Sequence, residues 1–430
     1  MRYTPITNQE YIDNRLKFIQ QMQPKSLAVF NSNDVQPTNA DGHLKFRQNN
    51  DLFYLTGIDQ EETILVLFPE ATNPKHREIL FLRKTSELIA IWEGHKFTKE
   101  EGTTLSGITT VYWTEQFESV FNVLVTEADY IYLNSNEHAR SSNQVQTRDE
   151  RFVIWCKEKY PLHTLKRAAP IMQELRMIKS ELEITQLKKA GSITEQAYAR
   201  VLKKVKAGVL EYEIEAEITH QFFRSGSRGH AYEPIIASGA SACVLHYIDN
   251  DKICKDGDLL LMDFGAEYGN YNADLTRTIP VNGRFTERQK AVYNAVLEVY
   301  KVAKDNLVAG TSFESYEQKV VKVMQEQLIK LGLFSKEDVE NQDPEQPLYK
   351  KYFMHGVSHF LGLDVHDVGH KRYGIRSGMV LTIEPGIYIR EEGLGVRIEN
   401  NIWVKENGNE ELMPNVATTV EEIEAAMSLG

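Results

Sequence analysis

Four acidic residues stand at the ends of apolar, strand-like runs, where a charged side chain is costly to bury. Asp263 follows LLLM and Asp274 lies 11 residues later, while Glu384 follows VLTI and Glu399 lies 15 residues later. Any one of them alone would be read as a turn residue or a solvated strand end, because acidic residues are almost never fully buried unless paired. Two strand pairs built in the same way favour a shared site, since residues on adjacent strands can face each other across a hairpin.

A histidine-rich segment offers one further ligand. HGVSHFLGLDVHD carries 3 of the 12 histidines, with His359 in its middle. Four carboxylates carry a charge of −4, which two divalent cations balance; a bridging hydroxide would then leave −1, whereas a single cation would leave −2. Oxygen-rich ligation with one imidazole suits hard ions such as Mn²⁺, with Co²⁺, Fe²⁺ and Zn²⁺ as alternatives. Two such ions about 3.5–4 Å apart can activate one water for amide hydrolysis without a Ser or Cys nucleophile.

The first part of the chain predicts an α/β domain, because short apolar runs alternate with helical stretches. LAVF, TILVLF, EILFL and YIYL predict buried strands, and 8–22 and 115–125 predict helices. From about Pro170 a long helical region begins, in which Ser180 and Glu183 form a capping box. We therefore place a boundary near residues 165–172 and predict two domains, 1–168 and 169–430.

The second domain is predicted to combine helices with antiparallel strand pairs. LLLMDFG and YNADLTRTI form one expected strand pair, and VLTIEPGIYI and GVRIENNIWV form another. Residues 286–307 and 313–331 predict two more helices. Each strand pair carries two of the four carboxylates.

Composition restricts the classes of function. The chain has 49 Lys+Arg against 61 Asp+Glu, a net charge of −12, which excludes the basic footprint of a nucleic-acid binder. Three cysteines without a CxxC motif predict a reducing compartment. The first residues contain no apolar signal region, and no apolar run approaches a membrane span, so we expect a cytoplasmic protein.

The segments that carry these residues resemble a known family. MDFGAEYGNYNADLTRT, HGVSHFLGLDVHD, TIEPGIY and VRIENN resemble the metal-binding motifs of the pita-bread metallopeptidases, and within that group those of aminopeptidase P. FRQNNDLFYLTGID resembles the amino-terminal domain of that family, and LRMIKSELEI its interdomain helix. The resemblance implies a creatinase-like α/β domain that covers the active site and supports oligomers. It also implies a pita-bread α+β catalytic domain with a curved antiparallel sheet backed by helices.

The resemblance also implies a role for each ligand. Asp263 would chelate one metal, His359 and Glu384 would hold the other, and Asp274 and Glu399 would bridge both. Glu384 would in addition shuttle a proton to the leaving nitrogen.

Three further histidines match family positions. His246 matches a histidine near the scissile carbonyl, with a buried, hydrogen-bonded histidine as the alternative interpretation. His366 matches one that stabilises the tetrahedral intermediate. His355 matches one that lines the proline pocket.

Three other residues match positions around the site. Arg397 and Tyr388 match residues that orient the bridging carboxylate and contact substrate, with packing inside strands as the alternative. Trp92 matches a tryptophan that closes the pocket of a neighbouring subunit, with ordinary core packing as the alternative. The family implies a homodimer or homotetramer.

The activity implied is removal of the first residue from peptides that have proline second. Prolidase is the alternative, because it shares the fold and all five ligands but cleaves only dipeptides; Ser358 between two histidines favours aminopeptidase P. Methionine aminopeptidase fits poorly, because its catalytic domain needs no such amino-terminal partner. A non-catalytic pita-bread scaffold or binding protein is the remote alternative, since such relatives usually lack metal ligands.

Overall fold

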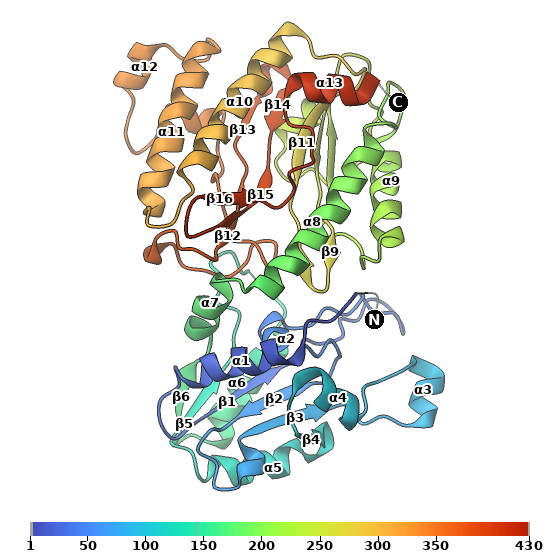
Figure 1. Cartoon of the computed structure of the whole chain (residues 1–430), viewed down its shortest axis with the longest axis vertical. Coiled ribbons are helices and arrows are strands. Elements are labelled where there is room, and N and C mark those ends of the chain that lie inside the picture. The colour runs from blue at the N-terminus through green and yellow to red at the C-terminus, as the bar shows by residue number, and fades with distance from the viewer. Residues whose placement is uncertain (1–2, 143, 429–430) are drawn as a thin grey trace. The chain divides into compact units, whose positions relative to one another are not determined.

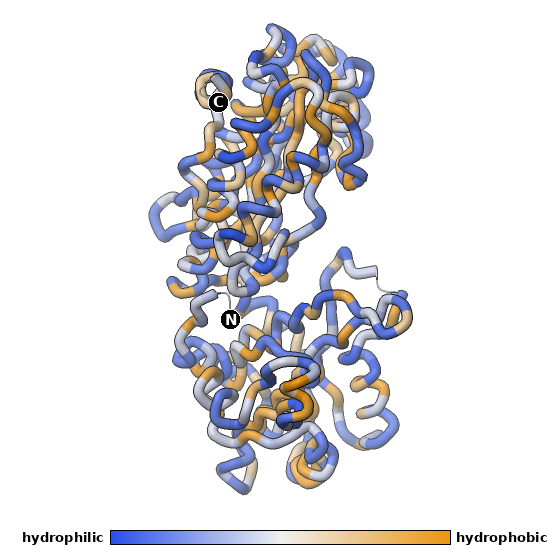
Figure 2. Tube along the Cα trace, turned by 90° about the vertical axis from the view of Figure 1, so that its right-hand side faces the viewer, coloured by the Kyte–Doolittle hydropathy of each residue, from blue (hydrophilic) through white to orange (hydrophobic). Residues whose placement is uncertain are grey.

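The computed structural model describes residues 3–142 and 144–428. The chain forms two compact units, one of Pro5–Arg176 and one of the residues from Met177 onward together with Tyr3 and Thr4. Most elements of both units are labelled in Figure 1. Figure 2 shows hydrophobic stretches of the Cα trace within each unit.

The first unit is an α/β domain around one six-stranded sheet of order β4-β3-β2-β1-β5-β6. β2 pairs antiparallel with both β1 and β3, and the remaining neighbours are parallel. The strands are β1 (Ser26–Asn31), β2 (Ile64–Leu67), β3 (Glu78–Leu82), β4 (Thr110–Trp113), β5 (Tyr130–Leu133) and β6 (Thr164–Arg167). The helices are α1 (Asn8–Ile19), α2 (Asn50–Thr56), α3 (Glu87–Glu93), α4 (Lys99–Ser106), α5 (Phe117–Val125), α6 (Arg148–Lys159) and α7 (Ala169–Met177).

The α/β prediction for this unit is confirmed. All four predicted strands are present, and the first predicted helix begins at Asn8 but ends at Ile19, three residues early. The sequence interpretation missed β4 and β6. β6 has the sequence TLKR and no buried residue, so it lacks the apolar run that marked the other strands.

The second unit combines helices with antiparallel strand pairs. Its strands are β7 (Ile235–Ser238), β8 (Leu259–Asp263), β9 (Glu267–Tyr268), β10 (Tyr271–Asn272), β11 (Thr276–Pro280), β12 (Val380–Ile383), β13 (Gly386–Ile389), β14 (Leu394–Arg397), β15 (Asn400–Val404) and β16 (Asn409–Glu411). Its helices are α8 (Glu181–Val201), α9 (Glu211–Arg224), α10 (Glu287–Asn306), α11 (Phe313–Lys330), α12 (Lys336–Glu340) and α13 (Val420–Ser428). Every strand pair in this unit is antiparallel.

The helices of this unit start where the sequence indicates. Ser180 and Glu183 form the predicted capping box of α8, with the Ser180 hydroxyl accepting from the Glu183 N–H. Thr286 and Gln289 form the same motif at α10. The apolar faces of these helices and the inner faces of the strands share one core, which includes Ile193, Met262 and Leu381.

The two strand pairs predicted to carry carboxylates are present, but each is interrupted. β8 pairs with β11, with Asp263 opposite Thr276, and the short hairpin β9–β10 lies between them in the chain. β12 pairs with β15, and β13 pairs with β14, so the ladder breaks around Glu384 and Glu399. A break frees side chains from regular alternation, and here it lies at two of the four carboxylates.

Among the described residues, no helix has the length and apolar character needed to cross a bilayer. Cys156, Cys243 and Cys254 are all buried and carry free thiols.

Candidate metal centre

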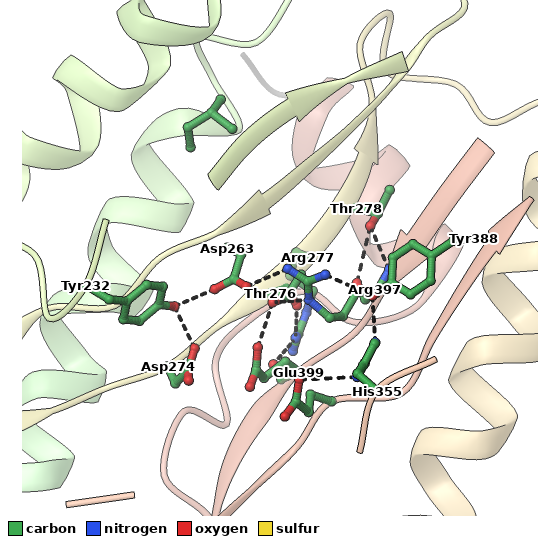
Figure 3. A network of polar contacts seen from close by, with 12 residues as sticks. Tyr232, Asp263, Asp274, Thr276, Arg277, Thr278, His355, Tyr388, Arg397 and Glu399 are labelled. Carbon is green, nitrogen blue, oxygen red and sulfur yellow. Dashed lines mark hydrogen bonds and ion pairs between the residues drawn. The ribbon is translucent and has the colours of Figure 1, made fainter. Parts of the chain in front are cut away.

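The first carboxylate pair is joined by a tyrosine. Asp263 is the last residue of β8, and Asp274 lies two residues before β11. The Tyr232 hydroxyl lies 2.5 Å from Asp263 Oδ1 and 2.6 Å from Asp274 Oδ1 (Figure 3). Asn401 clamps the backbone at Asp274, since its Oδ1 accepts from the Asp274 N–H and its Nδ2 donates to the Asp274 carbonyl. The two carboxylates are therefore held facing the same phenol.

The second pair lies at the break between β12 and β15. Glu384 immediately follows β12 and Glu399 immediately precedes β15. Glu399 Oε2 accepts from the Thr276 hydroxyl at 2.6 Å, and the Glu399 N–H donates to the Thr276 carbonyl. These contacts join β11 to the second strand pair, so the two halves of the site meet. Glu399 Oε1 is buried and has no hydrogen-bond partner.

His359 lies between the two pairs. Its Nε2 is 3.4 Å from Asp274 Oδ2 and 3.6 Å from Glu384 Oε1. Its Nδ1 lies 2.9 Å from the Phe360 carbonyl, which leaves Nε2 as the atom that faces the carboxylates. Asp274, His359 and Glu399 each offer a ligand atom within 4.8 Å of the others. The structure thus brings together all five predicted ligands.

Burial raises the pKa of three of these carboxyl groups. For Glu399 the pKa lies well above its ordinary value because of desolvation and the charges of Asp274 and Glu384. For Asp263 desolvation is also the main cause, opposed by the Arg397 guanidinium. For Glu384 desolvation raises the pKa to about 7. The four clustered carboxyl groups therefore ionise together only when a cation compensates their charge.

The donor set around these oxygens is also too small. One phenol proton serves two carboxylates at Tyr232, because a hydroxyl donates only once. Desolvation and the charges of Asp263 and Asp274 hold the pKa of Tyr232 well above its ordinary value, so the phenol keeps that proton. An orphaned buried carboxylate oxygen and four clustered carboxylates fit divalent cations bound by oxygen and one imidazole.

Arg397 and Tyr388 lie behind the first pair. Arg397 Nη2 is 2.5 Å from Asp263 Oδ2, its Nη1 is 2.9 Å from the Tyr388 hydroxyl, and its Nε donates to the Thr276 hydroxyl. Both residues are buried. The direct carboxylate contact of Arg397 is with Asp263, and it reaches Glu399 only through Thr276. Both side chains thus make specific polar contacts at the site in addition to their packing in the strands.

The other predicted histidines lie at different distances from the centre. His355 Nε2 is 2.8 Å from the Tyr388 hydroxyl, and its Nδ1 is 3.6 Å from Glu384 Oε2. The His366 ring lies against the His359 ring, with centroids 4.4 Å apart and planes at 88°. His246 is exposed, so its interpretation as a buried histidine is wrong.

The loop that carries His246 is fixed by a buried carboxylate. Glu211, at the start of α9, is fully buried. Its Oε1 accepts from the N–H and hydroxyl of Ser238, and its Oε2 accepts from the Tyr247 hydroxyl and the Lys252 N–H. Tyr247 and Tyr388 belong to one small hydrophobic cluster, which ties this loop to the strand behind the site.

Trp92 lies in the first unit, in α3, and is 81% exposed. The core alternative for this residue is therefore wrong. Leu88 and Ile91 on the same helix are also exposed, at 65% and 78%.

Sequence reasoning missed Tyr232, Thr276 and Asn401. Thr276 had a signal, because Asp274 and Thr276 are two residues apart in a strand-like segment and so share one face. Asn401 stands two residues after Glu399 in the same way. Tyr232 had none, since it precedes β7 in a loop and meets the carboxylates only in three dimensions.

Comparisons with known proteins identify the family. The model of metallopeptidase family M24 matches residues 185–406, and that of the aminopeptidase P N-terminal domain matches residues 11–132. The Xaa-Pro aminopeptidase of Escherichia coli (strain K12) is 36% identical over 437 residues, which cover 98% of each chain.

Solved structures are similar over nearly the whole chain. Aminopeptidase PepP of Pseudomonas aeruginosa is 31% identical with a TM-score of 0.88, and 99% of each chain is covered. An Escherichia coli aminopeptidase P variant in complex with substrate is 34% identical with a TM-score of 0.89, again covering 99% of each chain. The chain therefore belongs to metallopeptidase family M24, in its aminopeptidase P branch. Its fold is the α/β amino-terminal domain followed by the pita-bread catalytic domain with its curved antiparallel sheet.

Proposed function

We propose that this protein removes the amino-terminal residue from peptides with proline in second position. The observation that carries the proposal is the convergence of Asp263, Asp274, His359, Glu384 and Glu399 around a region short of positive charge. The Escherichia coli relative that is 36% identical along the chain bears the name Xaa-Pro aminopeptidase. A scaffold would not need to bury four carboxylates at this cost.

The site holds divalent metal, and we propose two ions, with Mn²⁺ the native metal. In this scheme Asp263 would hold one ion, His359 and Glu384 would hold the other, and Asp274 and Glu399 would bind both. Four carboxylates and one imidazole support a hard ion. When bound, such a pair supplies an activated water and polarises the scissile carbonyl.

The surrounding residues bind and orient the substrate. Glu384 accepts a proton from the attacking water and returns it to the proline nitrogen, and it lies 3.6 Å from both His355 and His359. His366, beside His359, donates to the developing oxyanion, and His246 lies near the scissile carbonyl. His355, held by Tyr388, forms a wall of the proline pocket. A substrate with proline in second position has a tertiary amide without an N–H, so the shape of the pocket around the proline ring selects the substrate.

A peptide panel tests this proposal. We expect cleavage of Xaa-Pro-Xaa tripeptides and longer peptides, and at least about 100-fold slower cleavage when alanine replaces proline. Chelation should abolish activity, and Mn²⁺ should restore it best among Mn²⁺, Co²⁺, Fe²⁺ and Zn²⁺. Cleavage restricted to Xaa-Pro dipeptides would instead assign prolidase. Undiminished cleavage after removal of all divalent ions would overturn the assignment.

We further propose a homodimer or homotetramer in the cytoplasm. The domain of residues 1–168 would cover the active site and mediate assembly, with residues 169–430 as the catalytic domain. The exposed apolar side chains of α3 support assembly, with Trp92 closing a neighbouring subunit's pocket. The three unpaired, buried cysteines support a reducing compartment. Sedimentation and peptidase kinetics of the parent protein and of Trp92→Ala test this proposal. The variant should form a smaller assembly or show a raised KM.

A further inference from the structure

A buried ion pair lies behind the loop that carries the active-site histidines. Lys179 Nζ is 2.9 Å from Asp367 Oδ2, and both side chains are 1% exposed. Removing two charges from water costs free energy that their attraction rarely exceeds, so such a pair is weak evidence of a purely stabilising role. The place of this pair in the fold indicates another role.

The ion pair is connected to His359 through one backbone carbonyl group. The Asp367 N–H donates to the Phe360 carbonyl at 2.9 Å. His359 Nδ1 lies 2.9 Å from the same carbonyl oxygen. One carbonyl therefore holds both the backbone of Asp367 and the imidazole of His359. A metal-binding histidine depends on such an outer partner, because the hydrogen bond at one nitrogen fixes the tautomer and aims the other nitrogen.

Lys179 is itself fixed in position. Its N–H donates to the Gly378 carbonyl at 2.8 Å, and the next residue, Ser180, caps α8. A Cβ at Gly362 would collide with Asp367 Oδ2 and lie 2.9 Å from Lys179 Cε, so only glycine lets the segment pass this close. The ion pair therefore packs against the backbone of the histidine-bearing loop.

The opposite side of the same loop is tied to the strand that leads to Asp274. The Asn272 N–H donates to the Gly362 carbonyl at 2.9 Å, and its Nδ2 donates to the Leu363 carbonyl at 2.8 Å. The loop is thus held between α8 and β10. His366, adjacent to Asp367, meets the His359 ring from this loop.

We propose that Lys179 and Asp367 are positioning residues, which hold the Phe360 carbonyl and His366 so that His359 Nε2 faces Asp274 and Glu384. The proposal rests on the proposed function for its catalytic readout. If it is right, loss of the pair lowers metal affinity and kcat together. KM changes little, because neither residue belongs to the proposed substrate pocket.

Three variants test the role of the pair. Asp367→Asn keeps the shape of the side chain but removes its negative charge. Lys179→Met removes the positive charge that pairs with Asp367. The double variant Lys179→Met with Asp367→Leu replaces the pair by an apolar contact, which restores packing without the charges. Metal affinity is measured by competition with a chelator using Mn²⁺ alone, next to kcat, KM and the melting temperature.

We expect the metal affinity of Asp367→Asn and of the double variant to fall about 10–100-fold, with KM within twofold of the parent value. Glu78→Gln is the matched control, because Glu78 forms a 3.1 Å ion pair with buried Arg15 in the other unit. It should leave metal affinity unchanged. A folded double variant with parental metal affinity and kcat would overturn the proposal and leave the pair a packing contact.

The metal measurement also separates this inference from the proposed function. A wild-type protein that binds Mn²⁺ but cleaves no Xaa-Pro peptide defeats the proposed function, and the affinity series still decides the role of the pair. Active wild type with unchanged affinity in Asp367→Asn and the double variant defeats only the positioning role.

Discussion

Two clusters of buried and half-buried acidic residues, one in each unit, differ in how many of their carboxylate oxygens accept a hydrogen bond. In the first unit, Asp149 Oδ1 and Oδ2 accept from the side-chain amides of Asn31 and Asn49. Asp51 Oδ1 and Oδ2 accept from Arg176 Nη1 and from the Asn134 amide. Every carboxylate oxygen of this pair has a donor from the protein, so the cluster is complete without a ligand.

The cluster of the second unit has too few donors for its carboxylate oxygens, although Arg397 donates to Asp263 and Thr276 donates to Glu399. Asp263 and Asp274 share the single proton of Tyr232, and Glu399 Oε1 has no partner. The nearest basic groups to Glu384 are imidazole nitrogens at 3.6 Å, too far for a hydrogen bond. The comparison shows that burial of acidic side chains does not by itself indicate a metal site. A shortage of hydrogen-bond donors around the carboxylate oxygens does indicate one.

The largest expected effect comes from removing a carboxylate of the second cluster. Asp274→Ala should lower kcat/KM by about 10³-fold, because metal ions contribute several kcal/mol to the transition state. Metal content after purification should fall as well, measured by atomic absorption. Asp149→Asn is the control and should keep both. Parental activity in Asp274→Ala would end the distinction between the clusters.

Tyr232→Phe should have a smaller effect. Loss of the shared phenol frees both carboxylates to rotate, and outer contacts of this kind typically change metal affinity 10–100-fold. Tyr293→Phe is the matched control, because the buried Tyr293 hydroxyl donates to the Thr418 carbonyl at 2.8 Å in the same unit. Chelator competition on both variants gives the comparison. Equal affinities would show that Tyr232 only fills space.

The smallest expected effect is a pH dependence of stability in the first unit. Burial raises the pKa of Asp149 from 3.8 to about 7, partly offset by the Asn31 hydrogen bond. Between about pH 4 and about pH 7, Asp149 keeps its proton in the folded state but has lost it in the unfolded state. Stability from this group is therefore fully present below about pH 4 and is lost as pH rises through about 7.

The corresponding slope is at most about 1.4 kcal/mol per pH unit for one proton. Denaturant unfolding between pH 5 and 8 measures it, and Asp149→Asn should remove it. Added Mn²⁺ should not change it, because every oxygen of this cluster already has a donor. The same slope in the variant would locate the titration elsewhere.

Much of the architecture could be predicted from the sequence, because strand periodicity and capping boxes are local. The strands that end at or next to Asp263 and Glu384 are apolar runs, and the capping box of Ser180 and Glu183 marks the start of α8. β6 could not be predicted, since TLKR contains no apolar run and forms a strand by pairing with β5. The break of the second strand pair at Glu384 also escaped, because paired strands look continuous in one dimension.

For the site, the sequence by itself determined the ligand types and their order, since chemistry resides in residue identity. Only the tertiary structure decided which proton goes to which oxygen: that Tyr232 joins Asp263 to Asp274, that Thr276 reaches Glu399, and that Lys179 holds Asp367 behind His359. These contacts join residues 31 to 188 positions apart. Hydrogen bonds are short and directional, so no local pattern in the chain can specify them.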